Sequence, residues 1–228
     1  MFRKTLITML AMLFLASQSF AARPLTTDDA GTVDKEGFEV EIGYDFAKNQ
    51  DESQSQSIGL SLNRGITEKL DFGIALPYEI KPNQGLGEAE VGVKFSLVKE
   101  KENSPAVSLT FSSELGASEY ALNTILTKEI GRLTAHLNLG YIATGKVDEK
   151  GVSTYSGAIE LLLGERLVLV SEIVGEADAD SNTKNPLEGL LGGRLQVSES
   201  LTFDLGIGIG GNDASPKWKT ILGLTYGF

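Results

Sequence analysis

Apolar and polar residues alternate along most of this chain, from Gly37 to the last residue, Phe228. The clearest example is 218–228, in which Trp218 and Leu222 share one face with four further apolar or threonine side chains. A repeat of two residues is typical of a β-strand and not of a helix. Aromatic residues at both ends of an apolar face are typical of strands that cross a bilayer. The pattern therefore predicts a membrane-spanning strand at the end of the chain.

The same alternation divides residues 37–228 into about twelve segments, counted along the printed sequence. The sixth segment is the least regular, because Ile125 and Lys128 interrupt its pattern. Most segments approach the roughly 9–11 residues that a tilted membrane strand needs, and an even strand number is the bacterial rule. The segments are centred on residues 38–46, 58–62, 70–78, 89–97, 107–111, 120–130, 133–141, 155–163, 167–176, 187–197, 201–210 and 218–228.

The connections between the segments alternate in length. Short connections such as 131–132 and 164–166 follow the even segments, whereas longer polar ones such as 145–153 and 177–186 follow the odd segments, with 99–105 as an exception. Short periplasmic turns, long outer loops and two aromatic belts distinguish a membrane barrel from a soluble sandwich. The sequence thus predicts an all-β fold, a transmembrane antiparallel β-barrel of about 12 strands.

The first 36 residues lie outside this pattern. Residues 1–21 have a basic start, an apolar run over 5–15 and small residues at 19 and 21, which predicts a cleaved signal peptide. Residues 22–36 are polar, rich in turn-forming residues and without a period, so we expect an N-terminal periplasmic segment or a plug of the barrel. No later apolar run is long enough for a spanning helix.

Composition and charge narrow the chemistry. The chain has no cysteine, which excludes a disulfide framework, a thiol nucleophile and a thiolate metal site. The formal net charge is −11, and it becomes −13 for a chain starting at residue 22, because the first 21 residues hold Arg3 and Lys4 and no acid. Such a balance argues against nucleic acid as a partner.

The inward face of the predicted barrel is strongly acidic. Three basic side chains cannot pair with every carboxylate there, and unpaired carboxylates keep water nearby or become protonated. We therefore expect a lumen that is at least partly wet and that prefers cations, so that phenolates or benzoates pass poorly. The pore-lining candidates are Glu39, Glu41, Asp45, Asp71, Glu79, Glu90, Glu114, Glu160, Glu172, Glu176, Glu188 and Asp204, with Glu88 beside them, the basic Lys94, Arg194 and Lys219, and the single histidine, His136.

Three motifs have simpler explanations than a reactive site. The glycines of 206–211 match G-x-G-x-x-G, but no helix can follow them to bind a dinucleotide. Asp178, Asp180 and Asn182 resemble the start of a calcium loop that lacks its glycine. His136 could serve a barrel hydrolase only beside a serine nucleophile, and a polar lining role is simpler. We accordingly predict no enzyme, no cofactor and no metal.

Residues 23–33 (RPLTTDDAGTV), 136–141 (HLNLGY), 167–176 (LVLVSEIVGE) and the ending from 214 (ASPKWKTILGLTYGF) carry a resemblance. They are similar to the family of transporter-like outer-membrane barrels named for the MetA pathway of phenol degradation. The resemblance covers nearly all of the chain after residue 21. It implies an outer-membrane barrel, and the family name implies a link to aromatic compounds.

These observations predict an exported, porin-like channel in the cell outer membrane for a small solute. Its other partners would be outer-membrane lipid and the barrel-assembly machinery, which would read the last strand ending in Phe228. A barrel of eight strands leaves no opening, and one of sixteen leaves an open channel. A barrel of about twelve strands is intermediate, which predicts a narrow or plugged pore. The alternatives are a structural or surface-binding barrel and a barrel hydrolase with His136.

Overall fold

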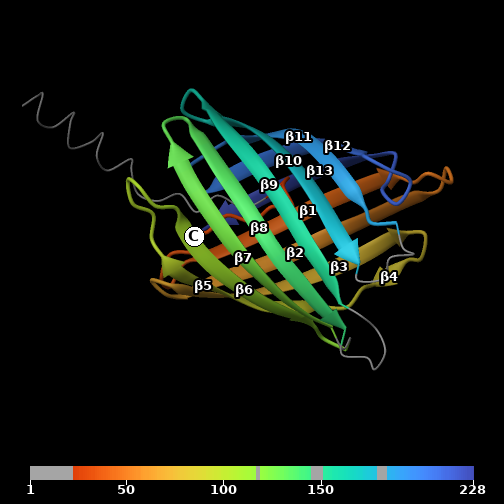
Figure 1. Cartoon of the computed structure of the whole chain (residues 1–228), viewed down its shortest axis with the longest axis horizontal. Helices are drawn as coiled ribbons and strands as arrows, with labels where there is room; N and C mark the ends of the chain where they lie inside the picture. Colours follow the sequence, from red (N-terminus) through yellow and green to blue (C-terminus); the bar gives the residue numbers. More distant parts are fainter. Residues whose placement is uncertain (1–22, 117–118, 145–150, 179–183) are drawn as a thin grey trace, which may run out of the picture.

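The computed structural model describes residues 23–116, 119–144, 151–178 and 184–228. Twelve long antiparallel strands form a closed barrel, because β2 pairs with both β1 and β3 (Figure 1). The two-residue β4 (Gly85–Leu86) extends only β3. The predicted fold class and strand number are confirmed. The barrel strands are β1 (Phe38–Lys48), β2 (Gln54–Thr67), β3 (Leu70–Lys81), β5 (Glu90–Val98), β6 (Ala106–Glu114), β7 (Glu119–Ile130), β8 (Leu133–Thr144), β9 (Val152–Leu163), β10 (Leu167–Asp178), β11 (Leu187–Gln196), β12 (Leu201–Gly210) and β13 (Trp218–Gly227).

The two faces of each strand differ in the way that the alternation predicts. On β13, Leu222 and Leu224 point outward and are exposed, whereas Ile221, directly before Leu222, points inward and is 7% exposed. On β12, Leu205 and Ile207 are likewise exposed around a buried inner face. The outer surface is therefore a continuous apolar band, as lipid contact requires. None of the described segments forms a helix long and apolar enough to span a membrane.

The barrel has a short-turn end and a long-loop end. At the short-turn end, Phe38 stacks on the C-terminal Phe228 with ring centroids 5.4 Å apart, and at the long-loop end Phe46 packs on Trp218 at 5.0 Å. The longer connection at the short-turn end, 99–105, holds the amine of Lys128 through Glu100 at 2.6 Å. This ion pair explains why Lys128 interrupts the alternation.

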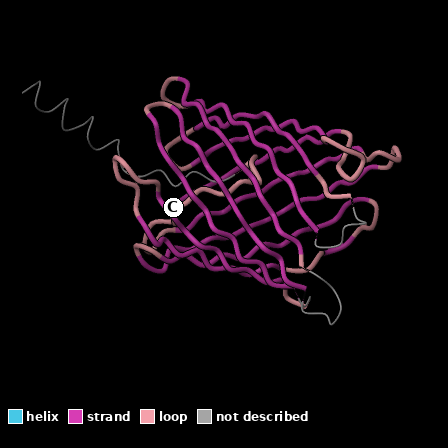
Figure 2. Tube along the Cα trace, viewed as in Figure 1, coloured by secondary structure: helices cyan, strands magenta, loops and turns pink. Residues whose placement is uncertain are grey.

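The segment before β1 runs inside the barrel, where Figure 2 shows it as a loop surrounded by strands. We call residues 23–33 the strap. Beyond it, Glu36 donates its N–H to the carbonyl of Gly65, and this bond fixes the entry of the chain into β1 at the short-turn end. The strap therefore enters the lumen from the short-turn end. The predicted signal peptide, residues 1–21, lies outside the described residues.

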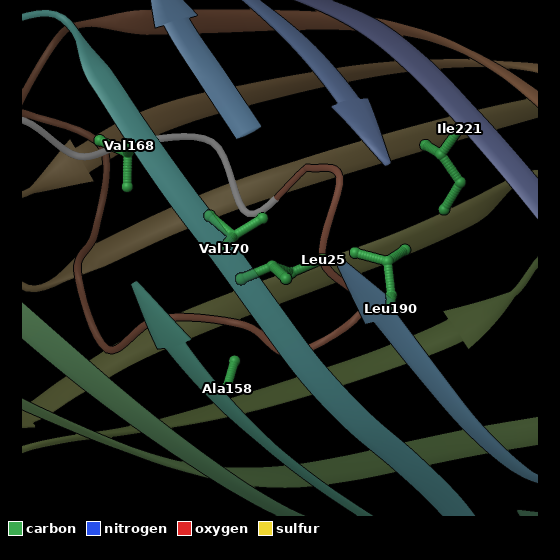
Figure 3. Close-up of a cluster of buried hydrophobic side chains, with 6 residues drawn as sticks. All are labelled: Leu25, Ala158, Val168, Val170, Leu190 and Ile221. Carbon is green, nitrogen blue, oxygen red and sulfur yellow. The ribbon is translucent and has the colours of Figure 1, made fainter. Parts of the chain in front are cut away.

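One half of the lumen is packed with apolar side chains. Leu25 of the strap contacts a cluster contributed by β9, β10, β11 and β13 (Figure 3), and Ile125 on β7 is fully buried. Val168 and Val170 on the inner face of β10 pack under Leu25, whereas Glu172 farther along the same face accepts hydrogen bonds from the strap. The strap and these side chains fill the lumen on this side, a feature that alternation alone does not predict. The cluster consists of Leu25, Ala158, Val168, Val170, Leu190 and Ile221.

This geometry predicts how charge on the outer face affects stability. Arginine at Leu205, in the middle of β12, should lower the free energy of unfolding by about 2–4 kcal/mol, because it places a charge near the bilayer midplane. The same change at Ile209, near the long-loop end of β12, should cost roughly 0–1 kcal/mol. Denaturant titration in lipid vesicles, followed by the fluorescence of the single tryptophan, Trp218, measures both. Equal losses would contradict the membrane orientation.

Candidate functional site: the strap and the cavity beside it

The main chain of the strap has no strand partner, so side chains of the barrel satisfy it. The buried carboxylate of Glu172 on β10 accepts the N–H groups of Thr26 and Thr27, with the closest contacts at 2.9 and 2.8 Å, and the Thr27 hydroxyl at 2.8 Å. On the opposite side, Asp71 on β3 accepts the N–H of Val33 at 3.0 Å. Buried peptide groups need such partners, because an unsatisfied donor costs about 1–3 kcal/mol. These two acids therefore anchor the strap.

The middle of the strap is held by a pair of polar side chains. Asn138 on β8 accepts the N–H of Asp28 through Oδ1 and donates Nδ2–H to its carbonyl, both at 2.8 Å. The Asp28 carboxylate forms an ion pair with Lys94 of β5 at 2.8 Å, and Lys94 also donates to the carbonyl of Asp29 at 3.1 Å. An asparagine that bonds both groups of one residue imitates a strand neighbour. The strap is thus paired to the barrel wall across two strands.

His136 belongs to the same network. The Thr127 hydroxyl accepts the N–H of Ala30 at 2.8 Å and lies 2.9 Å from His136 Nδ1, while Ser108 donates to the Ala30 carbonyl at 2.6 Å. The other ring nitrogen of His136, Nε2, lies 3.2 Å from Glu160. Among the described residues, no hydrogen bond joins a serine to His136. The contacts of His136 connect it to the groups that hold the strap.

Arginines hold the N-terminal end of the strap. Arg194 on β11 donates to the carbonyl of Arg23 at 2.6 Å and binds both carboxylate oxygens of Glu160, at 3.0 and 2.9 Å. Arg23 itself donates to the carbonyl of Leu222 at 3.2 Å and lies 3.9 Å from Asp204. A forked arginine–carboxylate pair is a strong and directional contact. Arg194 is therefore fixed more firmly than Arg23.

Two pairs of glycines on the wall make room for the strap. Gly192 and Gly206 face each other across β11 and β12, and a Cβ atom at either position would lie 3.0 Å from the Pro24 ring. Gly43 and Gly223 face each other across β1 and β13, and a Cβ atom on Gly43 would overlap the Arg23 guanidinium. These close approaches explain why the inner faces of β11 to β13 are rich in glycine.

The strap leaves open space on the side of β1 to β6. A cavity of about 320 Å³ is bordered by Asp28 and Asp29 of the strap and by polar residues of these strands; we call it the acid-lined cavity. Burial raises the pKa of Asp29, and the nearby Lys94 ammonium opposes that rise. A second cavity of about 120 Å³ lies toward the long-loop end. On the barrel wall, the first is lined by Glu39, Glu41, Asp71, Glu90 and Lys94, and the second by Asp45, Glu79 and Lys219.

The predicted lining residues therefore fall into four groups. Seven contact the strap directly or through Thr127, three form ion pairs with another wall residue, four border open space, and two lie at the long-loop end of their strands. Some of the carboxylates that alternation assigns to an open pore therefore bind the strap instead. The groups are Asp45, Asp71, Lys94, His136, Glu172, Arg194 and Asp204 for the strap; Glu160 with Arg194, and Glu188 with Lys219 at 2.6 Å, for pairs; Glu39, Glu41, Glu79 and Glu90 for open space; and Glu114 and Glu176 at strand ends.

Sequence reasoning missed the residues that the strap contributes. Arg23 adds a fourth base to the lumen, and Pro24 and Leu25 fill its apolar half. The available signal was the stretch 167–170 (LVLV), which is apolar on both faces of its predicted strand, since an apolar inner face in a barrel of this size requires something to cover it. The calcium-like stretch 178–182 lies outside the described residues, apart from the backbone of Asp178, which pairs with Val152.

Comparison with known proteins gives the fold. No protein-family model matches the chain, and no curated protein sequence matches it. Among solved structures, the NanC porin aligns over 83% of this chain and 98% of its own with a TM-score of 0.65 and 10% identity. The KdgM porin in complex with disordered oligogalacturonate gives 0.64 and 11%, over 83% of this chain and 99% of its own. The CymD monoaromatic hydrocarbon channel gives 0.53 and 10%, over 85% and 88%.

At these identities the similarity establishes the architecture alone. The chain has the fold of outer-membrane β-barrels, which confirms the fold implied by the resemblance in the sequence. Membership of the MetA-pathway family stays a prediction. The charges and cavities of this lumen are features of this chain, and the similarity of fold does not account for them.

The anchoring by Glu172 can be tested with a thiol reporter. Ala158→Cys places a single thiol under Leu25 in a chain without cysteine, at a position that is 4% exposed. In this background, Glu172→Ala should raise the rate of maleimide labelling at least about tenfold, because it leaves buried strap donors unsatisfied at about 1–3 kcal/mol each. Glu176→Ala removes the same charge from the same strand and should leave labelling slow. Equal rates in the two variants would refute the anchoring role.

Proposed function

We propose that the chain is a porin-like channel of the outer membrane for small solutes, narrowed by the strap. The observation that carries this proposal is the acid-lined cavity of about 320 Å³, which remains beside the strap within a closed twelve-strand barrel. A wall built only for mechanical support gains nothing from half-buried carboxylates that face open space, since partial desolvation disfavours their charged form. Water and a passing solute supply the solvation that the charged form of these carboxylates needs.

The similar solved structures support this proposal because they belong to porins and channels. They are porins and a channel for monoaromatic hydrocarbons, and these solutes are those of the respective proteins. For this chain, the acids around the cavity favour small cations and neutral solutes over phenolates or benzoates. Any uptake of aromatic compounds would accordingly involve the neutral forms.

Export and assembly form part of the proposal. The leader at 1–21 would direct export, and the last strand, ending in Phe228, would be read by the barrel-assembly machinery. Phe228 stacks on Phe38 and packs against Tyr226, so the final residue takes part in the aromatic belt at the short-turn end. A structural or surface-binding barrel is the second candidate, favoured by the dry half of the lumen under Leu25.

Deleting residues 23–33 decides between the two candidates. The deletion keeps the bond from Glu36 to Gly65 at the start of β1 and empties the lumen, so single-channel conductance should rise several-fold over the full-length protein. Heat-modifiable migration on gels confirms that both proteins are folded. If neither folded protein conducts, the structural barrel is the better description.

Ion selectivity tests the acid-lined cavity. In a KCl gradient, the reversal potential should have the sign of a cation-selective pore, because carboxylates dominate the passage. Glu39→Gln with Glu41→Gln should weaken the preference, since both residues border the cavity. The control, Glu165→Gln with Glu199→Gln, removes two charges at the short-turn end and should change it little. An anion-selective sign in the unaltered protein would contradict the proposal.

A further inference from the structure

The two cavities are separated by a row of residues with almost no side chains. Along the inner wall, Glu41 and Ser61 border the acid-lined cavity, and Asp45 and Ser57 border the smaller one. The strand register places one cross-strand row between these levels. That row runs through Gly223, Gly43, Gly59 and Pro77, on β13, β1, β2 and β3.

The Arg23 guanidinium occupies one side of this row. It fills the space over Gly43 and Gly223, where added Cβ atoms would collide with it, and it lies 3.7 Å from Asp45. Its side chain remains 19% exposed. Over Gly59, a Cβ atom would have no atom of the described residues within 4 Å, its own chain neighbours aside. The row is therefore blocked by a cation at one side and open at the other.

The guanidinium is held by few and long contacts. Its ion pairs with Asp45 and Asp204 measure 3.7 and 3.9 Å, and its hydrogen bond to the carbonyl of Leu222 measures 3.2 Å. Arg194, by contrast, is clamped by Glu160 at 2.9 and 3.0 Å. Two carboxylates thus face one guanidinium, and removal of the Arg23 charge would leave both of them without this cation.

We propose that Arg23 is the specificity-determining residue of the passage. A solute that moves between the two cavities crosses the row above Gly59 and passes the guanidinium of Arg23 at close range. The acids before and after it concentrate cations, and the single positive charge between them lowers the cation preference that those acids alone would produce. The passage accordingly takes small neutral solutes and small monovalent cations, and it disfavours multivalent cations. This inference rests on the proposed channel function.

Charge substitution at Arg23 tests the inference. Arg23→Gln should raise the K⁺/Cl⁻ permeability ratio by at least about twofold, because a charge a few ångströms from the path is weakly screened. Arg23→Lys keeps the charge and should stay near the unaltered ratio. Lys69→Gln removes one positive charge at the β2–β3 turn and should also leave the ratio unchanged. An unchanged ratio in Arg23→Gln, or equal effects of Gln and Lys, would overturn the proposal.

The same variants must keep the strap in place. The Ala158→Cys reporter, combined with Arg23→Gln, should label as slowly as with the native arginine, because Leu25 still covers it. If labelling becomes fast, the strap has left and the ratio reports an emptied lumen. The comparison then moves to Gly59→Cys in the native-arginine background, which leaves the strap untouched.

Gly59→Cys tests the route directly. A cationic methanethiosulfonate reagent should modify this thiol quickly and reduce the current, whereas Ala158→Cys, also on the inner wall, should react slowly. A Gly59→Cys thiol that does not react, or a modification that leaves the current unchanged, refutes the route past Arg23. If the thiol reacts but no variant conducts, the proposed channel function is wrong, although the space over Gly59 is open. Failure of the channel function can thus be distinguished from failure of the route past Arg23.

Discussion

The requirement that buried peptide groups find hydrogen-bond partners governs the interior of this barrel. The strands satisfy one another, but the strap crosses the lumen without a neighbouring strand. Glu172, Asn138 and Asp71 supply the missing acceptors from three different strands. Because these side chains are fixed in the wall, they also fix where the strap lies, and hence where open space remains.

The strap divides the lumen into halves of different chemistry. Over β9 to β11, Leu25 and Pro24 complete a dry apolar core of the kind found inside soluble proteins. Over β1 to β6, carboxylates and Lys94 border an open cavity. A lumen that is wet throughout would leave Val168 and Val170, two apolar residues on the inner face of β10, unexplained.

The strands and their lipid-facing residues could be predicted from the sequence, whereas the contacts inside the barrel could be predicted only in part. A repeat of two residues fixes which side chains face lipid, so the strands and the position of Ile221 opposite Leu222 follow directly. The partners of inward residues depend on contacts between distant segments, such as Arg194 with Glu160. The path of the strap has no periodicity, and a glycine such as Gly43 shows its purpose only beside the guanidinium that it admits.

The strap also has a consequence for the order of folding. Neighbouring strands meet through hairpins that are local in the sequence, whereas Arg23 bonds to the carbonyl of Leu222, 199 positions away. The other residues that anchor the strap are spread over the barrel wall from β3 to β11. No partial sheet presents these groups together, and long-range contacts of this kind form late. We therefore expect the strap to reach its place only after the hairpins around it have formed.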